Sequence, residues 1–217
     1  MLGEPLSGEA LAVAARRAGV RDPRVLGALA AVDRTGFVPS QHAALADRDV
    51  PVPIPHDQVT TQPSLSARMI EGLDLVGTER VLEVGTGYGF QTAVLAALSR
   101  EVYSVERWPD LADAARENLA ARAVENVRVF VGDGSQGLPD GAPYQAILVS
   151  AASPQVPPPL VAQLAPDGRL VQPIGLGGHE RVTLFRGAGR GRLEAVRVLT
   201  GAHFVPLRGR HGLTAWR

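Results

Sequence analysis

Apolar residues occur along the chain in two alternating patterns, short strand-like runs and longer stretches with helical spacing. The strand-like runs lie at 81–84, 101–106, 127–131, 146–150 and 168–173. Their length and apolar character predict parallel strands that are covered on both faces. Stretches with helical spacing separate the first three runs, at 91–100 and 109–122, and a short helix is expected before the fifth. This alternation predicts a parallel sheet with right-handed crossovers, whose ligands bind at the carboxyl ends of the strands.

The two ends of the chain depart from this alternation. Helical spacing over 7–18, and a second helix over 23–32 with proline at its first position, predict an N-terminal helical cover. Near the other end, 181–186 and 193–199 are strand-like runs with no helix between them, which predicts an antiparallel edge hairpin. The expected fold class is therefore α/β, a Rossmann-like, doubly wound and mostly parallel seven-stranded sheet.

A proline-rich segment precedes the first strand of this sheet. Residues 47–56 contain three prolines, too many for a central strand, so we expect an extended loop that is packed or functional. Pro63 then opens a helix that extends through Gly72. Thr61 stands next to the expected N-cap, and its hydroxyl is either a helix cap or a substrate ligand.

A glycine-rich turn follows the strand at 81–84. Gly85, Gly87 and Gly89 allow the backbone to approach a ligand where a Cβ atom would clash, although such glycines also serve close packing. The dinucleotide fingerprint places its third glycine one residue later, and Glu83 would repel a diphosphate. A carboxylate at this position suits a ligand with positive charge, such as the sulfonium and ammonium groups of S-adenosylmethionine.

Two further carboxylates follow neighbouring strands. Glu106 ends the second strand roughly twenty residues beyond the glycines, where α/β nucleoside sites place an acid against the ribose hydroxyls. The alternative is a solvated strand end. Asp133 follows the third strand and is either an acceptor for the adenine amino group or part of an Asp-Gly turn.

The composition excludes several classes of site. The 217 residues favour a single α/β domain, and 22 basic residues balance 22 acidic ones, so nothing favours a nucleic-acid or membrane partner. The chain has no cysteine, which excludes disulfides and thiolate nucleophiles, and its five histidines lack metal-ligand spacing. All basic residues are arginine, which excludes Schiff-base chemistry. We therefore expect no metal site. We also expect a cytoplasmic protein, because no run is apolar enough to span a membrane and no signal-peptide pattern is present. A monomer is the expected oligomeric state.

Several ordered motifs resemble a known family. Leu82 to Gln91 reads L-E-V-G-T-G-Y-G-F-Q, close to the pattern L-E-I-G-T-G-S-G-Y-Q, and Val102 to Arg107 reads V-Y-S-V-E-R, close to V-Y-S-I-E-R. Other matching segments are 22–26, 34–39, 51–54, 132–134, 137–139, 141–144 and 204–207. These patterns are similar to those of the protein-L-isoaspartate O-methyltransferases, which are class I S-adenosylmethionine-dependent methyltransferases.

One segment departs from that family. The family usually has G-Q-T-I-S-Q-P before the helix, and the matching residues here read D-Q-V-T-T-Q-P, from Asp57 to Pro63. Thr61 replaces the serine whose hydroxyl lies at the methyl-transfer site, and it keeps a hydroxyl. Val59 replaces a threonine, and Asp57 replaces a glycine, where its charge and bulk would reshape the substrate cleft.

The resemblance implies methyl transfer from S-adenosylmethionine to the carboxylate of L-isoaspartyl residues in damaged proteins or peptides. Thr61 is the implied catalytic residue. The implied cofactor-binding residues are Glu83, Val84, Gly85, Thr86, Gly87, Gly89, Glu106, Arg107, Asp133 and Gly134. The implied substrate-binding residues are Gln58, Thr60, Thr61, His203 and Val205. We expect one methyltransferase domain over 1–217, with helices and substrate loop in 1–60 and the cofactor-binding core in 61–217.

Three alternatives stay open at this stage. A related methyltransferase would modify a biosynthetic peptide or a small molecule, and the departures at Asp57 and Val59 motivate this possibility. A non-catalytic module would bind the nucleoside without transferring a methyl group. An NAD-dependent oxidoreductase would need the third glycine at dinucleotide spacing, which this chain lacks.

Overall fold

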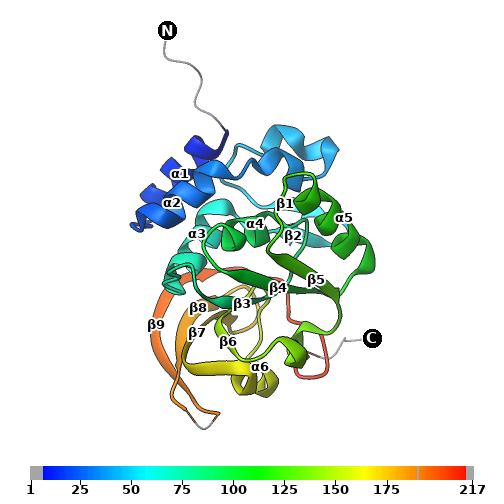
Figure 1. Ribbon diagram of the computed structural model, residues 1–217. Helices are drawn as coiled ribbons and strands as arrows, with labels where there is room; N and C mark the ends of the chain where they lie inside the picture. Colours follow the sequence, from blue (N-terminus) through cyan, green and yellow to red (C-terminus); the bar gives the residue numbers. More distant parts are fainter. Residues whose placement is uncertain (1–6, 190, 214–217) are drawn as a thin grey trace.

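The N-terminal helical cover is present in the computed structural model, which describes residues 7–189 and 191–213. It consists of α1 (Ser7–Arg17) and α2 (Pro23–Ala31). Asp22 is the N-cap of α2 and accepts a hydrogen bond from the Arg24 backbone N at 2.8 Å, and Pro23 follows at the first helical position. Figure 1 shows both helices packed together at one end of the molecule, beside α3.

A seven-stranded sheet with the order β5-β4-β3-β6-β7-β8-β9 forms the centre of the molecule. Its strands are β3 (Arg80–Val84), β4 (Glu101–Glu106), β5 (Val127–Val131), β6 (Tyr144–Val149), β7 (Leu164–Ile174), β8 (Glu180–Gly187) and β9 (Leu193–Ala202). The strands from β3 to β7 pair in parallel, whereas β8 and β9 pair antiparallel at one edge. The predicted fold class, a Rossmann-like and mostly parallel sheet with an antiparallel edge hairpin, is confirmed. The predicted single domain over 1–217 extends beyond the described residues and stays a prediction.

Helices cover both faces of this sheet, as Figure 1 shows. Those on one face are α3 (Pro63–Gly72), α4 (Phe90–Ala96) and α5 (Pro109–Ala120), while α6 (Pro158–Gln163) lies on the other. Side chains alternate accordingly along β3. Val81 packs in the core cluster that contains the N-terminal helices, and Leu82 and Val84 pack in the opposite cluster. Both faces are buried, which explains why the strand is apolar almost throughout.

Short 3₁₀ helices occur in the connections: η1 (Arg34–Phe37), η2 (Ser40–Leu45), η3 (Gly134–Gln136) and η4 (Pro139–Gly141). Some boundaries differ from the sequence prediction. α4 ends at Ala96 rather than continuing to residue 100, in a turn where the Ser99 hydroxyl donates to the Leu95 carbonyl at 2.7 Å. β7 begins at Leu164, directly after α6, and is longer than expected.

The expected extended loop at 47–56 is wrong in one respect, because part of it is a strand. β1 (Val52–Ile54) pairs antiparallel with β2 (Gln58–Thr60) in a two-stranded sheet apart from the central one. Proline is tolerated here because a two-stranded sheet consists of edge strands only. His56 and Asp57 turn the chain with φ values of 64° and 55°, and the Gln58 N–H donates to the Pro55 carbonyl at 3.3 Å. These two left-handed residues and this hydrogen bond close the three-residue connection between the strands.

Candidate active site

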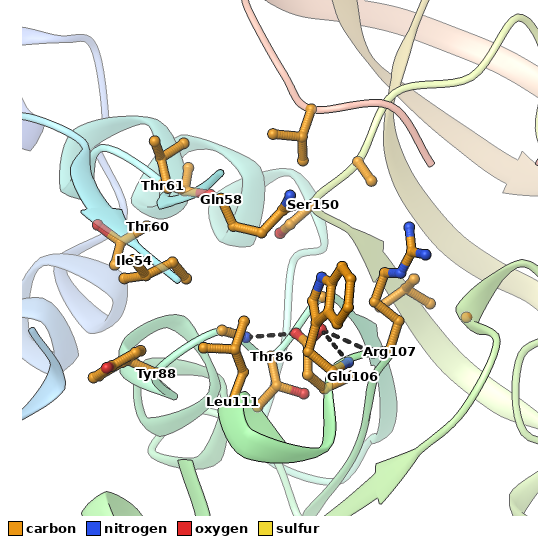
Figure 2. Close-up of a pocket in the computed structure, with 18 of the residues that line it drawn as sticks. Ile54, Gln58, Thr60, Thr61, Thr86, Tyr88, Glu106, Arg107, Leu111 and Ser150 are labelled. Atoms are coloured by element: carbon orange, nitrogen blue, oxygen red, sulfur yellow. Dashed lines mark hydrogen bonds between the residues drawn. The ribbon is translucent and has the colours of Figure 1, made fainter. Parts of the chain in front are cut away.

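A cavity of about 430 Å³ lies at the carboxyl ends of β3, β4 and β6, between the sheet and the β1–β2 hairpin. In Figure 2, Thr86, Glu106 and Leu111 lie on one side of it, while Ile54, Thr60 and Thr61 lie on the other. The walls are formed by Ile54, 56–61, Ser66, 84–91, 105–108, Leu111, Gly134, Ser150, Ala151 and 205–208. β3 and β6 are neighbours although two strands separate them in the sequence, so the cavity lies where the strand order reverses, as expected for an α/β ligand site.

The glycine turn forms the floor of the cavity. Gly85, Gly87 and Gly89 have φ values of 97°, 56° and 93°. Residues with a Cβ atom rarely adopt the angles of Gly85 and Gly89, so the backbone itself requires glycine there, and the left-handed angle of Gly87 favours glycine. A Cβ atom on Gly134, which also lines the cavity, would come within 2.3 Å of a Val84 methyl carbon, so a close approach to β3 requires glycine there.

Glu106 ends β4 with its carboxylate beside this turn. One oxygen accepts a hydrogen bond from the Gly87 N–H at 2.9 Å. The other accepts from the backbone N–H groups of Arg107 at 2.8 Å and Trp108 at 3.1 Å. Glu106 is 5% exposed, and it lines the cavity. The structure therefore excludes a freely solvated strand end, since three backbone hydrogen bonds hold this carboxylate at the wall.

Glu83 lies behind the wall and does not line the cavity. Its carboxylate is fully buried and accepts hydrogen bonds from Gln91 at 3.1 Å, Thr92 at 2.5 Å and Ser104 at 2.6 Å. Burial raises the pKa of the Glu83 carboxyl to about 7, although these three donors oppose the shift. Glu83 thus acts on the cavity through Gln91, whose side chain does form part of the wall.

An aromatic pair closes the cavity beyond Glu106. The His56 ring, at the tip of the β1–β2 hairpin, stacks on Trp108 with 3.8 Å between ring centroids and 6° between planes. His56 Nε2 lies 2.9 Å from both carboxylate oxygens of Asp110, and this hydrogen bond lowers the pKa of Asp110. The Arg107 guanidinium lies 4.8 Å from the Trp108 ring centroid. These contacts join the hairpin to the start of α5 across the cavity.

A buried arginine shapes the opposite wall. Arg34 is 0% exposed, and its guanidinium donates to the carbonyls of Arg48 and Val50 and to the Thr60 hydroxyl oxygen, each at 2.9 Å. Burial lowers the pKa of Arg34 to about 10, which leaves it protonated at neutral pH. The Thr60 oxygen also accepts from the Val52 N–H at 3.1 Å, so both of its lone pairs are used within the protein.

Thr61 is not the N-cap of α3. Gln62 occupies that position, and the Asp49 carboxylate accepts hydrogen bonds from the Ser64 N–H and the Gln62 side-chain amide, each at 2.8 Å. Asp49 therefore does the work of a capping side chain, and the interpretation of the Thr61 hydroxyl as a cap is wrong. Thr61 lies on the cavity wall, where its hydroxyl is available to a ligand.

Most of the predicted site residues meet at this cavity. Those that line it are Gln58, Thr60, Thr61, Val84, Gly85, Thr86, Gly87, Gly89, Glu106, Arg107, Gly134 and Val205. Glu83, Asp133 and His203 do not line it. The His203 ring is 79% exposed and lies 3.7 Å from the Glu180 carboxylate, so its predicted contact with substrate finds no support in this geometry.

The Asp133 carboxylate is hydrogen-bonded to other groups of the protein. It is the N-cap of η3, where one carboxylate oxygen accepts from the Ser135 N–H at 2.9 Å and the other from the Arg210 N–H at 2.7 Å. These bonds lower the pKa of the Asp133 carboxyl despite its partial burial. The turn interpretation therefore describes Asp133 in this structure, and its contact with adenine stays a prediction.

Sequence reasoning missed three wall residues whose buried polar atoms have no hydrogen-bond partner. They are the Ser66 Oγ, the Gln91 Oε1 and the Trp108 Nε1. Buried polar atoms are almost always paired in proteins, so atoms left unpaired in a cavity wall are candidate contact points for a ligand or an ordered water molecule. Gln91 belongs to the glycine motif and Trp108 follows Glu106 closely, whereas nothing in the sequence distinguished Ser66 from the other residues of its helix.

Within the described ranges, no group of three or more His, Cys, Asp or Glu side chains is arranged to hold a metal ion. The helices in the same ranges are all too short or too polar to cross a bilayer.

Comparison with known proteins shows which family the chain resembles. The sequence model for protein-L-isoaspartate(D-aspartate) O-methyltransferase matches residues 7–212. A protein-L-isoaspartate O-methyltransferase of Myxococcus xanthus is 48% identical over 195 residues, which cover 89% of this chain and 92% of the relative. That of Methanoculleus marisnigri is 48% identical over 198 residues, with coverage of 91% and 89%.

Solved structures agree with the sequence relatives. A structure described as a protein-L-isoaspartate O-methyltransferase has a TM-score of 0.78 and 27% identity, covering 94% of this chain and 67% of that one. A putative enzyme of this kind from Plasmodium falciparum, in complex with S-adenosyl-L-homocysteine, has a TM-score of 0.76 and 24% identity, covering 93% and 98%, and it supports the fold. The resemblance found in the sequence is thereby confirmed, and the chain belongs to the protein-L-isoaspartate(D-aspartate) O-methyltransferase family.

Proposed function

We propose that this enzyme transfers the methyl group of S-adenosylmethionine to the free carboxylate of L-isoaspartyl residues in damaged proteins or peptides. The observation that carries the proposal is the two-sided cavity, in which a glycine turn and Glu106 face Thr61 across one shared space. The nucleoside cofactor that donates the methyl group would occupy the side of the glycine turn, and the peptide that accepts it would occupy the side of Thr61. Membership of the family supports the same pair of ligands.

The donor side follows the strand order. Gly134 follows β5, Glu106 ends β4, the glycine turn follows β3, and Ser150 follows β6, so these residues form a row along one edge of the sheet. Glu106 accepts the ribose hydroxyls, and adenine lies on the Gly134 side, near Asp133. The backbone of the glycine turn runs beneath the sulfonium. Glu83, buried behind the turn with a pKa of about 7, is partly ionised at neutral pH, and in that form it supplies negative charge for a cationic cofactor without touching it.

The acceptor side is formed by the segment between the hairpin and α3. Thr61 donates its hydroxyl hydrogen to the acceptor carboxylate. Gln58, whose amide nitrogen donates to the His56 carbonyl at 2.8 Å, lies beside the path of the peptide. Thr60 positions this segment through Arg34, and Val205 closes the cavity from the segment after β9. His203 lies at the exposed end of that segment, where only a longer peptide would reach it.

The reaction needs positioning rather than a strong base. The carboxyl group of an isoaspartyl residue has a pKa of about 4, so the acceptor is already ionised at neutral pH. In an in-line displacement, a carboxylate oxygen forms a bond to the methyl carbon while the carbon–sulfur bond breaks and its electron pair returns to sulfur. The products are a neutral methyl ester and S-adenosylhomocysteine. Near-attack geometry and exclusion of water lower the barrier to this step.

Thr61→Val tests the acceptor assignment. Valine matches threonine in shape and lacks the hydroxyl, so kcat/KM for an isoaspartyl peptide should fall about tenfold or more. The calorimetric Kd for S-adenosylhomocysteine should stay within about twofold of wild type, and Thr61→Ser should restore turnover. Full turnover by the valine variant would contradict the proposed role of the Thr61 hydroxyl.

We also propose that the enzyme is a single domain that acts as a monomer in the cytoplasm. Every side chain assigned to donor and acceptor comes from one chain, so a second copy is not needed to complete the site. Size-exclusion chromatography with light scattering measures the mass directly, and a dimer at micromolar concentration would contradict the monomer.

A further inference from the structure

The side chain of Gln91 lies on the first turn of α4, directly beside the glycine turn, and it is 7% exposed. Its amide nitrogen donates to the Glu83 carboxylate at 3.1 Å and to the Ser150 hydroxyl at 2.7 Å, which uses both of its hydrogens. Its amide oxygen is buried in the cavity wall and has no partner.

This orientation of the amide is set by Glu83. In the structure a Glu83 oxygen accepts a hydrogen bond from the Gln91 amide nitrogen, so the amide oxygen faces away from Glu83. Thr92 and Ser104 hold Glu83 in place from the other side, at 2.5 Å and 2.6 Å. The structure therefore presents one fixed acceptor at the wall, and an unpaired buried acceptor costs free energy until a donor reaches it.

The position of Gln91 in the row of strands identifies the donor. Glu106 lies on the β4 side of the glycine turn, and the bond from Gln91 to Ser150 places Gln91 on the β6 side. A ligand with its ribose at Glu106 and its sulfonium above the turn directs its amino-acid end toward β6. The α-carboxylate of that end would be repelled by an amide oxygen, whereas the α-ammonium group carries three donors.

We propose that Gln91 is a cofactor-binding residue whose amide oxygen accepts a hydrogen bond from the α-ammonium group of the methionine moiety, and that buried Glu83 holds the amide in this orientation. The inference rests on the proposed cofactor. The Glu83 carboxylate, the Gln91 amide and the ammonium group would form a chain of two hydrogen bonds, in which each bond polarises and strengthens the other. Glu83 thereby contributes to binding a cation that it does not touch.

The test compares S-adenosylhomocysteine with its desamino analogue, in which hydrogen replaces the ammonium group. Isothermal titration calorimetry gives the Kd of each ligand for wild type, Gln91→Leu and Gln163→Leu. Gln163 is the matched control because it is also a glutamine that is 7% exposed, it bonds to Leu138 N and to the Gln136 carbonyl, and it lies outside the cavity.

Gln91→Leu should raise the Kd of S-adenosylhomocysteine about 10- to 100-fold, which is the range for a lost hydrogen bond to a charged group. It should change the Kd of the desamino analogue by less than about threefold. Gln163→Leu should lower the melting temperature yet leave the ratio of the two Kd values at its wild-type level. If Gln91→Leu weakened the binding of both ligands equally, Gln91 would have only a structural role, which would overturn the inference.

A second measurement needs no variant and so survives a folding failure. In wild-type protein labelled with ¹⁵N, the Gln91 side-chain amide resonances should shift on addition of S-adenosylhomocysteine and much less with the desamino analogue. Identical shifts with both ligands would contradict the inference while leaving the cofactor assignment intact. If wild type bound neither compound, the proposed cofactor itself would be wrong, and Gln91 with it.

Discussion

At Glu83, a residue for which we propose an indirect role in binding, burial makes stability depend on pH. Its pKa rises from 4.5 to about 7 because the carboxyl is fully buried. The folded protein therefore holds a proton that the unfolded chain releases between these two values. The free energy of unfolding contributed by this group is highest below pH 4.5 and decreases as the pH rises through about 7, by about 3 kcal/mol in total.

Glu83→Gln removes this titration. The difference in free energy of unfolding, variant minus wild type, should therefore increase by up to about 3 kcal/mol as the pH rises from about 4.5 to about 8. Urea unfolding of both proteins across this range, followed by circular dichroism, measures the difference. A difference that stays constant with pH would mean that Glu83 ionises in the folded state as it does in water.

At the residue scale, the sequence predicted the glycines and Glu106 because each sits at a strand end with a fixed spacing. It did not predict that Glu83 would lie behind the wall, because the alternation of side chains along a strand depends on the register that the fold selects. Gln91 and Ser66 were missed for a related reason. Their importance lies in an unpaired oxygen, which only the three-dimensional packing reveals.

At the element scale, the β1–β2 hairpin is the part of the site where this chain departs most from its family. The sequence indicated a loop because three prolines suggested one, and a two-stranded sheet escaped notice since its strands are only three residues each. The φ of 55° at Asp57 lies in the left-handed region that favours glycine, which is the residue of the family pattern at this position. The other α-helices and the strands of the central sheet were predicted from their periodicity, apart from the ends of α4 and β7, whereas the short 3₁₀ helices were not predicted.

Asp57→Gly should relieve this backbone strain and raise the free energy of unfolding by about 0.5–1 kcal/mol. It also removes a carboxylate from the cavity wall, so KM for an isoaspartyl peptide with acidic neighbours should fall relative to one with basic neighbours. Asp57→Asn is the control, because asparagine tolerates a left-handed conformation and removes only the charge. If Asn and Gly variants gave the same stability as wild type, strain at this turn would be negligible.

At the scale of the whole molecule, the cavity is built by segments from distant parts of the sequence, namely the hairpin, the glycine turn, α5 and the chain after β9. The mostly parallel sheet that brings them together was predicted from the alternation of strands and helices, whereas its strand order was not. The closure of the cavity was not predicted either, because it depends on contacts such as the stacking of His56 on Trp108.

This architecture predicts one cooperative unfolding transition that ligand shifts as a whole. S-adenosylhomocysteine at a hundredfold excess over its Kd should add about 2.7 kcal/mol of stability and raise Tm by roughly 5–10 °C. Far-UV circular dichroism and tryptophan fluorescence, measured in a Trp216→Phe background to isolate Trp108, should report the same Tm. NAD at equal concentration is the control and should leave Tm unchanged. Separate transitions for the two probes would contradict a single domain.

The central claim is that donor and acceptor meet in one cavity, where a methyl group passes to an isoaspartyl carboxylate. The most direct measurement incubates the enzyme with S-adenosylmethionine labelled on its methyl group and two peptides that differ only in an L-isoaspartyl or an L-aspartyl linkage. The account predicts base-labile label on the isoaspartyl peptide and background label on the aspartyl one. Equal labelling of both peptides, or no labelling by an enzyme that binds S-adenosylhomocysteine, would contradict it.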